Sequence, residues 1–336
     1  MKMIQGRRPT QRDIALASGM SQAAVSLVLN RVEPCTVSEA ARKRILEIAD
    51  NLGYVPNRVA QNLQSTRTRT LAVVVPDITN PTYPALVRGF QSVADAAGYD
   101  VMIYDTDGTR ERELRALQWL LQGHVDGVLA AFFHLVEADI LPLVKRGMAL
   151  VQVESQAHRA SKHIDKVYVD NAAAAQAMTR ALIARGHSRI ALLSCAIGPG
   201  KERQRGYRAA MQQAGLPLCE ISADEFTQAA GERCMAQFLR GRHGCTAVFA
   251  ANDLLAIGAM AALHARGLRI PQDMAVAGFD DIPSAQLLHP PLSTVHRSEQ
   301  AMGRFAAERL LLQLNEGPKV AGSFELPYQL VMRASV

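Results

Sequence analysis

Long apolar runs, aromatic residues and paired cysteines are all scarce in this sequence, and each absence excludes a class of protein. No run approaches the roughly 20 apolar residues that a helix needs to cross a bilayer, so membrane insertion is not expected. Residues 1–10 are basic and polar with no apolar stretch behind them, which argues against a secretory signal peptide. Aromatic residues are only 5% of the chain while alanine and leucine are frequent, and this favours α/β layers over an all-β sandwich. We therefore expect a cytoplasmic α/β protein.

The cysteines and histidines form no recognisable site. The five cysteines are odd in number and dispersed, and no two make a Cys-x-x-Cys pair, which indicates buried thiols in a reducing compartment rather than a disulfide framework. The nine histidines are scattered, and His243-Gly-Cys245 offers too few ligands for zinc. Neither a metal nor a cofactor is expected.

The common signatures of enzymes are missing as well. The segment Gly198-Pro-Gly-Lys201 distantly matches a phosphate-binding loop, but Cys195 stands where its first glycine belongs and Glu202 where a serine or threonine belongs. The sequence contains neither a Gly-x-Ser-x-Gly nor a dinucleotide-binding Gly-x-Gly-x-x-Gly motif. Catalysis is therefore not expected.

The net positive charge is confined to one end of the chain. Residues 1–70 hold eleven Lys and Arg against five acidic residues, which accounts for the whole net charge of +6. Residues 71–336 hold 26 basic and 26 acidic side chains. A basic module in front of a neutral body indicates a protein that meets a polyanion with one end, and we favour nucleic acid over a merely solvated charged face.

The basic module predicts three short helices. Thr10 can cap the first, Asp13 lies in its first turn, and Gly19 ends it. Ser21 can cap a second helix that runs to Asn30, and a third is predicted over residues 38–52. Two short helices separated by a glycine-containing turn form a helix-turn-helix, whose second helix enters the major groove. The alternative is a three-helix unit with no role on DNA.

That docking assigns roles to named side chains. Gln22 on the second helix can pair with an adenine edge, whereas Ala23 and Leu27 can make only apolar contacts, for instance with a thymine methyl. Phosphate contacts are expected from the helix N-termini and their neighbours, namely Thr10, Ser21, Ser26 and Asn30. These contacts position the protein on DNA more than they select a sequence.

Residues 57–63 can form about two turns of helix after Pro56, and the Thr-rich basic stretch behind them reads as a linker to residue 70. A lone helix this short is marginal in water, so we expect it to fold on DNA. The predicted domains are thus a helix-turn-helix over 1–56, a hinge helix and linker over 57–70, and a core over 71–336.

The motifs Thr-x-x-Asp-Ile-Ala-x-x-Ser-Gly-Met-Ser-x-x-x-Val-Ser-x-Val-Leu-Asn (10–30) and Gly-Tyr-Val-Pro-Asn-Arg-Val-Ala-Gln-Asn-Leu (53–63) resemble the LacI/GalR family of bacterial transcription regulators. Later motifs at 75–81, 251–253 and 278–281 extend the resemblance to the whole chain. It implies a homodimer on a pseudo-palindromic operator, with DNA contacts at Asn57, Arg58 and Leu63. Leu63 would wedge into the minor groove and kink the duplex. Leu27 departs from the family, since many relatives carry arginine there.

From residue 71 onward, short apolar runs alternate with amphipathic helices, which predicts parallel sheets with right-handed crossovers in two subdomains. Strands are expected at 71–75, 101–104, 127–130, 149–153, 167–169, 190–193, 247–250, 274–278 and 324–331. The expected subdomains are 71–166 plus 294–320 and 167–293 plus 321–336. The resemblance implies the same architecture, a periplasmic-binding-protein-like core that binds a small effector between its subdomains.

Ligands of such sheets bind beyond the carboxyl ends of the strands. The residues expected there, with amide, carboxylate, guanidinium and aromatic groups suited to a polyol, are Asn80, Tyr83, Glu154, Arg203, Phe226, Asn252 and Asp280. Each has a structural alternative: Tyr83 as core, Arg203 paired with Glu154, and Asn252 as a helix cap. Asp170 is read chiefly as a cap. By resemblance, Arg203, Asn252 and Asp280 match effector-binding positions, whereas Glu154-Ser155 departs from the Asp-Arg pair of sugar-responsive members.

We therefore expect a cytoplasmic, homodimeric regulator that is switched by a sugar, a sugar acid or a related metabolite, and we favour a repressor. A dimer is preferred to a tetramer because no heptad repeat follows Val331. Two other classes stay open, a solute-binding protein and a DNA-architectural protein without operator control. The effector, the operator and the sign of the response are not encoded in any motif.

Overall fold

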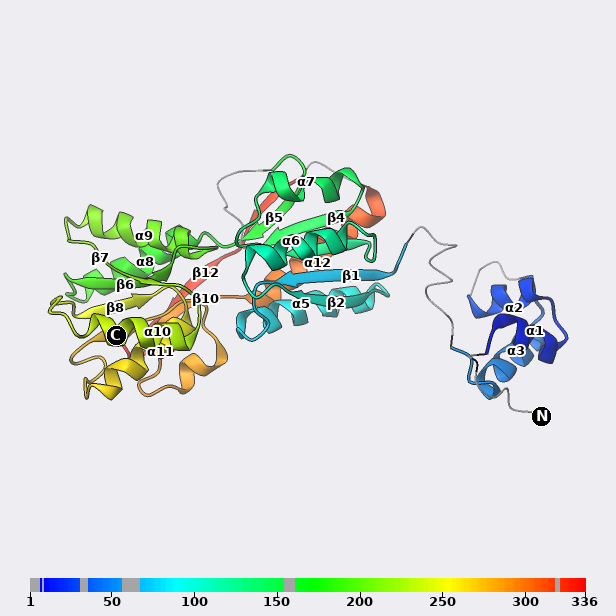
Figure 1. Cartoon of the computed structure of the whole chain (residues 1–336), viewed down its shortest axis with the longest axis horizontal. Helices are drawn as coiled ribbons and strands as arrows, with labels where there is room; N and C mark the ends of the chain where they lie inside the picture. Colours follow the sequence, from blue (N-terminus) through cyan, green and yellow to red (C-terminus); the bar gives the residue numbers. More distant parts are fainter. Residues whose placement is uncertain (1–6, 8, 31–35, 56–66, 154–160, 318–320) are drawn as a thin grey trace. The chain divides into compact units, whose positions relative to one another are not determined.

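The structure, a computed structural model, describes residues 7, 9–30, 36–55, 67–153, 161–317 and 321–336. The chain divides into two compact units, residues 1–68 and 69–336 (Figure 1). The expected hinge residues Asn57, Arg58 and Leu63 and the expected pocket residue Glu154 lie outside the described residues.

The described residues of the first unit contain α1 (Gln11–Ser18), α2 (Gln22–Leu29) and α3 (Glu39–Asn51), as the capping residues predicted. A capping box joins Thr10 and Asp13 at the start of α1, and Gly19 ends that helix at φ +69° in the left-handed region. Ser21 and Ser38 each cap their helix by accepting a backbone N–H. The helices enclose a small core of five buried residues: Ile14, Val25, Val28, Ile45 and Ala49.

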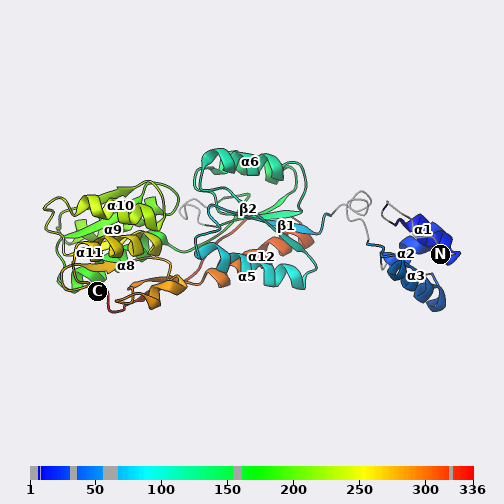
Figure 2. The same cartoon turned by 60° about the horizontal axis from the view of Figure 1, so that its bottom comes forward.

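The second unit contains a first lobe built on a six-stranded parallel sheet in the order β11-β5-β4-β3-β1-β2. Its strands are β1 (Thr70–Val75), β2 (Asp100–Asp105), β3 (Gly127–Ala130), β4 (Ala149–Val153), β5 (Asp165–Tyr168) and β11 (Ser323–Glu325). One face is covered by α5 (Thr82–Ala96) and α12 (Glu299–Glu316), the other by α6 (Arg110–Leu120) and α7 (Glu137–Lys145). Figure 2 shows α6 across the sheet from α5 and α12.

The second lobe is a four-stranded parallel sheet in the order β7-β6-β8-β9. Its strands are β6 (Ile190–Cys195), β7 (Cys219–Ala223), β8 (Ala247–Ala250) and β9 (Ala275–Ala277). One face carries α8 (Asn171–Ala184) and α9 (Gly200–Gln213), and the other carries α10 (Gln228–Phe238) and α11 (Asp253–Ala265). A short 3-10 helix, η1 (Pro283–Leu287), follows β9.

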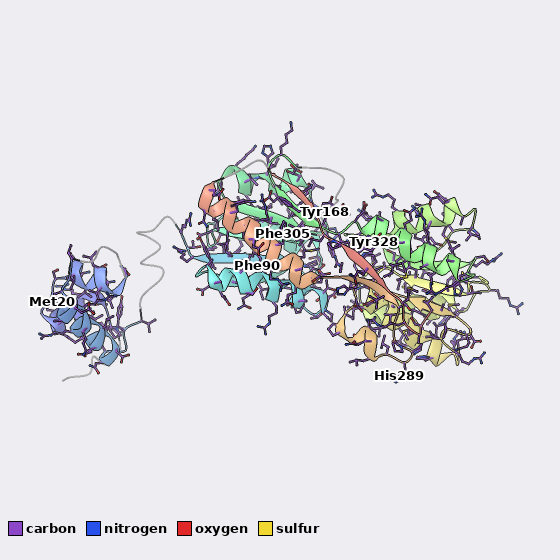
Figure 3. All side chains as sticks on the ribbon, turned by 180° about the vertical axis from the view of Figure 1, so that it is seen from behind. Met20, Phe90, Tyr168, His289, Phe305 and Tyr328 are labelled. Atoms are coloured by element: carbon purple, nitrogen blue, oxygen red, sulfur yellow. The ribbon has the colours of Figure 1, made fainter. Side chains whose placement is uncertain are left out.

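The chain passes between the two lobes three times. The first passage follows β5, and the other two run through β10 (Thr294–Arg297) and β12 (Tyr328–Val331), which pair with each other in a separate antiparallel ribbon. Figure 3 marks Tyr168 at the end of β5 and Tyr328 at the start of β12. Segments distant in sequence therefore form one hinge.

Three helix pairs are packed so closely that a glycine lies at each contact. A Cβ added to Gly303 of α12 would collide with the carbonyl oxygen of Leu86 in α5, and one added to Gly206 of α9 would collide with that of Ala172 in α8. A Cβ added to Gly258 of α11 would likewise collide with the carbonyl oxygen of Gln228 in α10. Backbone thus meets backbone within each lobe. Phe90 and Phe305, marked in Figure 3, add aromatic surface from α5 and α12 to the first lobe's core.

The predicted fold class is confirmed, but two strands lie in a different lobe from the one expected. The boundaries expected at 166/167 and 320/321 cut through β5 and assign β11 to the second subdomain. Both strands instead pair in the first sheet, β5 with β4 and β11 with β5. Strand–helix alternation does not reveal which sheet a strand joins, because pairing depends on residues far away in the chain. The pattern also missed β7 and α10 and merged β11 with β12.

Candidate DNA-recognition helix and effector cavity

Helix α2 presents its first turn to solvent and its opposite side to the core. Gln22 and Ala23 are exposed, Leu27 is partly buried, and Val25 and Val28 are buried. A base-reading helix needs this division, because the side chains that enter the groove must not also hold the helix in place. The predicted base-contacting residues therefore lie on the accessible side of α2.

The expected phosphate-contacting residues mostly have structural roles as well. The Ser21 hydroxyl accepts the N–H of Ala24 at 3.1 Å, and the Asn30 amide donates to the Ser26 hydroxyl at 3.1 Å. At the start of α1 the Thr10 backbone N–H and hydroxyl both donate to the Asp13 carboxylate, at 2.8 and 2.7 Å. These hydrogen bonds hold the pKa of Asp13 below its usual range.

The second unit contains a cavity of about 340 Å³, a size suited to a small molecule. It lies at the carboxyl ends of strands from both lobes: Pro76 and Asp77 follow β1, and Asn252 follows β8. Six of the seven expected pocket residues line it, namely Asn80, Tyr83, Arg203, Phe226, Asn252 and Asp280. The residues that the sequence predicted to share a site therefore line one cavity, although they lie as much as 200 positions apart in the chain.

Arg203 is the most enclosed side chain of the cavity wall, with 1% of its surface exposed. Its Nε donates to Asn171 Oδ1 at 2.9 Å, its Nη1 to the carbonyl of Ala251, and its Nη2 to Asp280 Oδ1 at 3.1 Å. The guanidinium carbon also lies 3.7 Å from the centre of the Phe279 ring. The carboxylate that balances this arginine among the described residues is Asp280.

Asp280 joins the cavity to the hinge. Its Oδ1 also accepts the Nε of Arg297, at 3.1 Å, and Arg297 pairs with Glu299 at 2.6 Å. Arg297 ends β10 and Glu299 begins α12, so a buried ionic network runs from the second lobe through the hinge into the first. Asp280 has φ +114°, a conformation that costs an aspartate of the order of 1–3 kcal/mol.

Asn252 is a helix cap, the structural alternative considered for it, and it also lines the cavity. It caps α11 by accepting the N–H of Leu255 at 2.9 Å, and its amide donates to the carbonyl of Phe226 at 3.2 Å while it lines the cavity. Next to it, Asp253 is fully buried, and burial together with Asp280 raises its pKa to about 8. Asp170 acts as the expected cap and accepts the N–H groups of Ala172 and Ala173.

Sequence reasoning missed the loop that carries Phe133. This ring lines the cavity and lies 6.0 Å from Phe226, centre to centre, in an edge-to-face arrangement from the opposite lobe. The loop is held by Glu113, which is completely buried and accepts the N–H groups of Phe133, His134 and Leu135 at 2.7–3.0 Å. The sequence pattern assigns Glu113 no role, because an acidic residue within an amphipathic helix carries no signal for a buried partner.

Sequence reasoning also missed the acidic rim, to which Asp77, Asp107, Asp224 and Glu225 contribute. Within the described ranges, no three His, Cys, Asp or Glu side chains lie close enough together to hold a metal ion. The helices of the described segments include none with the length and apolarity for a membrane crossing.

Comparisons with known proteins agree with both units. Residues 10–57 match the family of bacterial regulatory proteins, lacI family, and residues 179–336 match a periplasmic binding protein-like domain. The HTH-type transcriptional repressor PurR of Vibrio atlanticus is 31% identical over 331 residues, which cover 97% of this chain and 98% of PurR. The HTH-type transcriptional repressor CytR of Escherichia coli K12 is 30% identical, with 97% and 96% covered.

Among solved structures, the lac repressor dimer bound to operator and the anti-inducer ONPF aligns with a TM-score of 0.87 at 26% identity, covering 98% of this chain and 99% of that one. A complex of the transcriptional regulator CelR with cellobiose aligns at a TM-score of 0.72 and 29% identity, covering 98% and 100%. A helix-turn-helix unit joined to a two-lobed core of this kind defines a DNA-binding transcriptional regulator. The relatives match it from end to end. The chain belongs to the lacI family of bacterial regulatory proteins.

Proposed function

We propose that this protein is a homodimeric repressor of transcription that binds a pseudo-palindromic operator and is switched by a small molecule held in the cavity between its lobes. The observation that carries this proposal is the convergence of six polar and aromatic residues, from both lobes, on one cavity beside the hinge through which the chain passes three times. The lac repressor complex with operator and the CelR complex with cellobiose support it by similarity.

The residues divide into two groups by role. On DNA, Gln22 reads a base edge and Ala23 and Leu27 contact thymine methyl groups, while phosphates are held by Thr10, Ser21, Ser26 and Asn30. In the hinge, Asn57 and Arg58 contact DNA and Leu63 wedges into the minor groove. The effector is bound by the cavity residues Asn80, Tyr83, Arg203, Phe226, Asn252 and Asp280, and by Glu154, which lies outside the described residues. The proposed domains are 1–56 for DNA, 57–70 for the hinge and 71–336 for the effector and dimer contacts.

The switch depends on a difference in effector affinity between two arrangements of the lobes. An effector changes operator affinity only by as much as it prefers one arrangement, typically 1–3 kcal/mol of coupling. The network of Arg203, Asp280, Arg297 and Glu299 spans the hinge, so a ligand that touches Asp280 acts directly on the joint between the lobes.

Exposed apolar residues on two sheet edges fit the dimer contact. Met102 and Ile103 lie on β2, the last strand of the first lobe's sheet, and are 44% and 45% exposed. Leu218, 44% exposed, precedes β7, the last strand of the second lobe's sheet. Open sheet edges with apolar side chains favour association, and a second copy would cover both.

A regulator of this kind acts in the cytoplasm and performs no catalysis.

The first test is selection of bound duplexes from a random DNA pool at physiological and at higher salt. Recovery of an inverted repeat with a flexible central base step supports operator control. If no consensus sequence is recovered and binding is lost as salt rises, the binding is only electrostatic, as in a DNA-architectural protein. Leu63→Ala should then weaken binding to the selected repeat far more than to random DNA. A Gln22 substitution should alter base preference at one symmetric pair of positions.

Effector control is tested on the same repeat. Arg203→Ala and Asp280→Ala should keep operator affinity and lose the response to an effector, because both residues lie in the core unit and not in the DNA-binding unit. A variant that still responds would place the effector site elsewhere.

A further inference from the structure

We infer that the cavity takes an organic cation, a molecule with an amine or similar positively charged group beside an apolar ring or flat face. This inference rests on the proposed function, since it assigns a ligand class to the same cavity. It also narrows the expected effectors, because the groups that select a cation exclude sugar acids and phosphate esters.

The positive charges of the cavity wall are already balanced inside the protein. The two lining cations are Arg203 and Arg297, both buried. Each lies 3.1 Å from Asp280 Oδ1, and Arg297 also lies 2.6 Å from Glu299. Two arginines thus face two buried carboxylates, and an anionic ligand would have to displace Asp280 to gain either of them.

Four further carboxylates line the cavity, two from each lobe. Asp77 and Asp107 belong to the first lobe, and Asp224 and Glu225 belong to the second. Asp107 and Asp224 have arginine partners, Arg112 at 3.7 Å and Arg233 at 2.6 Å, but every member of these pairs is more than half exposed. Solvent-exposed ion pairs interact weakly and are screened by salt, so the two arginines leave most of the negative potential of the four carboxylates in place.

Helix N-termini offset this potential only in part. Five helices begin at the cavity, and three of them have their first N–H groups taken by side-chain caps, namely Thr109, Thr227 and Asn252. At the start of α5 the N–H of Thr82 donates to Asn80 Oδ1 at 3.2 Å, and α9 begins without a side-chain cap. Each N-terminus acts as roughly half a positive charge even when a neutral side chain caps it, so the helix starts together match about two to three of the four carboxylates and leave a net negative potential.

The remaining surface of the cavity suits an organic cation better than a metal ion. The described carboxylates do not come together in a group that could hold a metal. Phe133 and Phe226 meet edge to face from the two lobes, and aromatic faces attract ammonium groups. Thr82, 4% exposed, also lines the cavity, and its buried hydroxyl has no hydrogen-bond partner, which leaves it to a ligand.

A cation would also favour the closing of the lobes. Because each lobe contributes two carboxylates, bringing the lobes together costs repulsion in the empty cavity. A positive charge placed between the carboxylates of the two lobes attracts both sets, so their repulsion no longer opposes closing. The charge of the ligand thus both selects it for this cavity and makes it bind more tightly to the closed arrangement of the lobes.

The test uses the metabolite extract of a bacterial culture, separated by ion exchange into cationic, neutral and anionic fractions. Each fraction is added to the full-length protein on its selected operator, and both operator affinity and melting temperature are measured. We expect the cationic fraction alone to act. Action confined to the neutral or anionic fraction would overturn the cation inference and leave the proposed function intact, whereas no response to any fraction would contradict effector control itself.

Variants locate the effect in the cavity. Asp77→Asn and Glu225→Gln each remove one rim charge and should raise the amount of the cationic fraction needed for half the response by about tenfold. Glu232→Gln is the matched control, because Glu232 is exposed on α10 and does not line the cavity. Equal behaviour of the three variants would refute a role for the rim charge.

Discussion

Replacement of Glu113 by glutamine tests how the cavity wall is built. The Glu113 carboxylate is completely buried, with Oε1 accepting the N–H of Phe133 at 2.7 Å and Oε2 accepting those of His134 and Leu135 at 3.0 and 2.9 Å. Glutamine keeps the shape but turns one acceptor into an NH₂ donor that faces backbone donors. Loss of charged hydrogen bonds at a buried site costs about 3 kcal/mol. In a core unit of this size, that corresponds to a melting temperature lower by roughly 6–12 °C.

Thermal unfolding of the variants can be followed by the protein's own tryptophan fluorescence. Trp119, the only tryptophan, lies on the same helix as Glu113, so its fluorescence reports the unfolding of the first lobe. Glu111→Gln is the control: it lies on the same helix with an exposed ion pair to Arg115, which contributes under about 1 kcal/mol. If the Glu113→Gln protein melts within 2 °C or so of the Glu111→Gln protein, the carboxylate does not hold the Phe133 loop and the reasoning fails.

Three further predictions test other parts of the structure. Ile45→Ala should cost about 3 kcal/mol in the small helical core and abolish operator binding, while the Trp119 melting curve stays unchanged; coupled melting of both units would contradict their independence. The pKa of Asp253 is raised to about 8 in the folded protein, against about 4 in the unfolded chain. The free energy of unfolding of the wild type should therefore fall as pH rises from 5 to 8, by up to ~1.4 kcal/mol per pH unit relative to Asp253→Asn. Urea unfolding measures this difference, and a difference that does not change with pH would show that Asp253 stays charged. Gly303→Ala should lower the melting temperature of the core, because its methyl group meets the backbone of Leu86, whereas an unchanged value would mean that α5 and α12 can separate without cost.

Local signals predicted the helical unit well. Thr10, Ser21 and Gly19 begin and end helices through hydrogen bonds and backbone conformations that involve only neighbouring residues, so their effect is visible in the sequence. The order of strands and helices in the core followed from alternation of apolar and amphipathic segments in the same way. Sheet membership did not, because β5 and β11 pair with each other although more than 150 residues separate them in the chain.

The cavity was predicted in part for a similar reason. Asn80, Asn252 and Asp280 follow strands directly, so the strand prediction placed them at the correct end of a sheet. Phe133 and Arg297 depend on long-range partners, Glu113 for the loop of one and Asp280 for the charge of the other. No periodicity or spacing marks such partners in advance. The balance of charge inside the cavity therefore emerged only from the structure.

The glycines at the helix contacts give the lobes a mechanical property. Where backbone rests on backbone, no side chain can change rotamer to absorb a push, so each lobe moves as a stiff arm. Strand β1 runs the length of such an arm: its six residues span about 20 Å, from the cavity at Asp77 to the point where the chain leaves for the DNA-binding unit. A tilt of about 10° at the cavity end of a 20 Å strand displaces its far end by roughly 3 Å. A stiff first lobe of this kind would act as a lever, which carries a ligand-sized closure at the cavity to Thr70, the first residue of the strand.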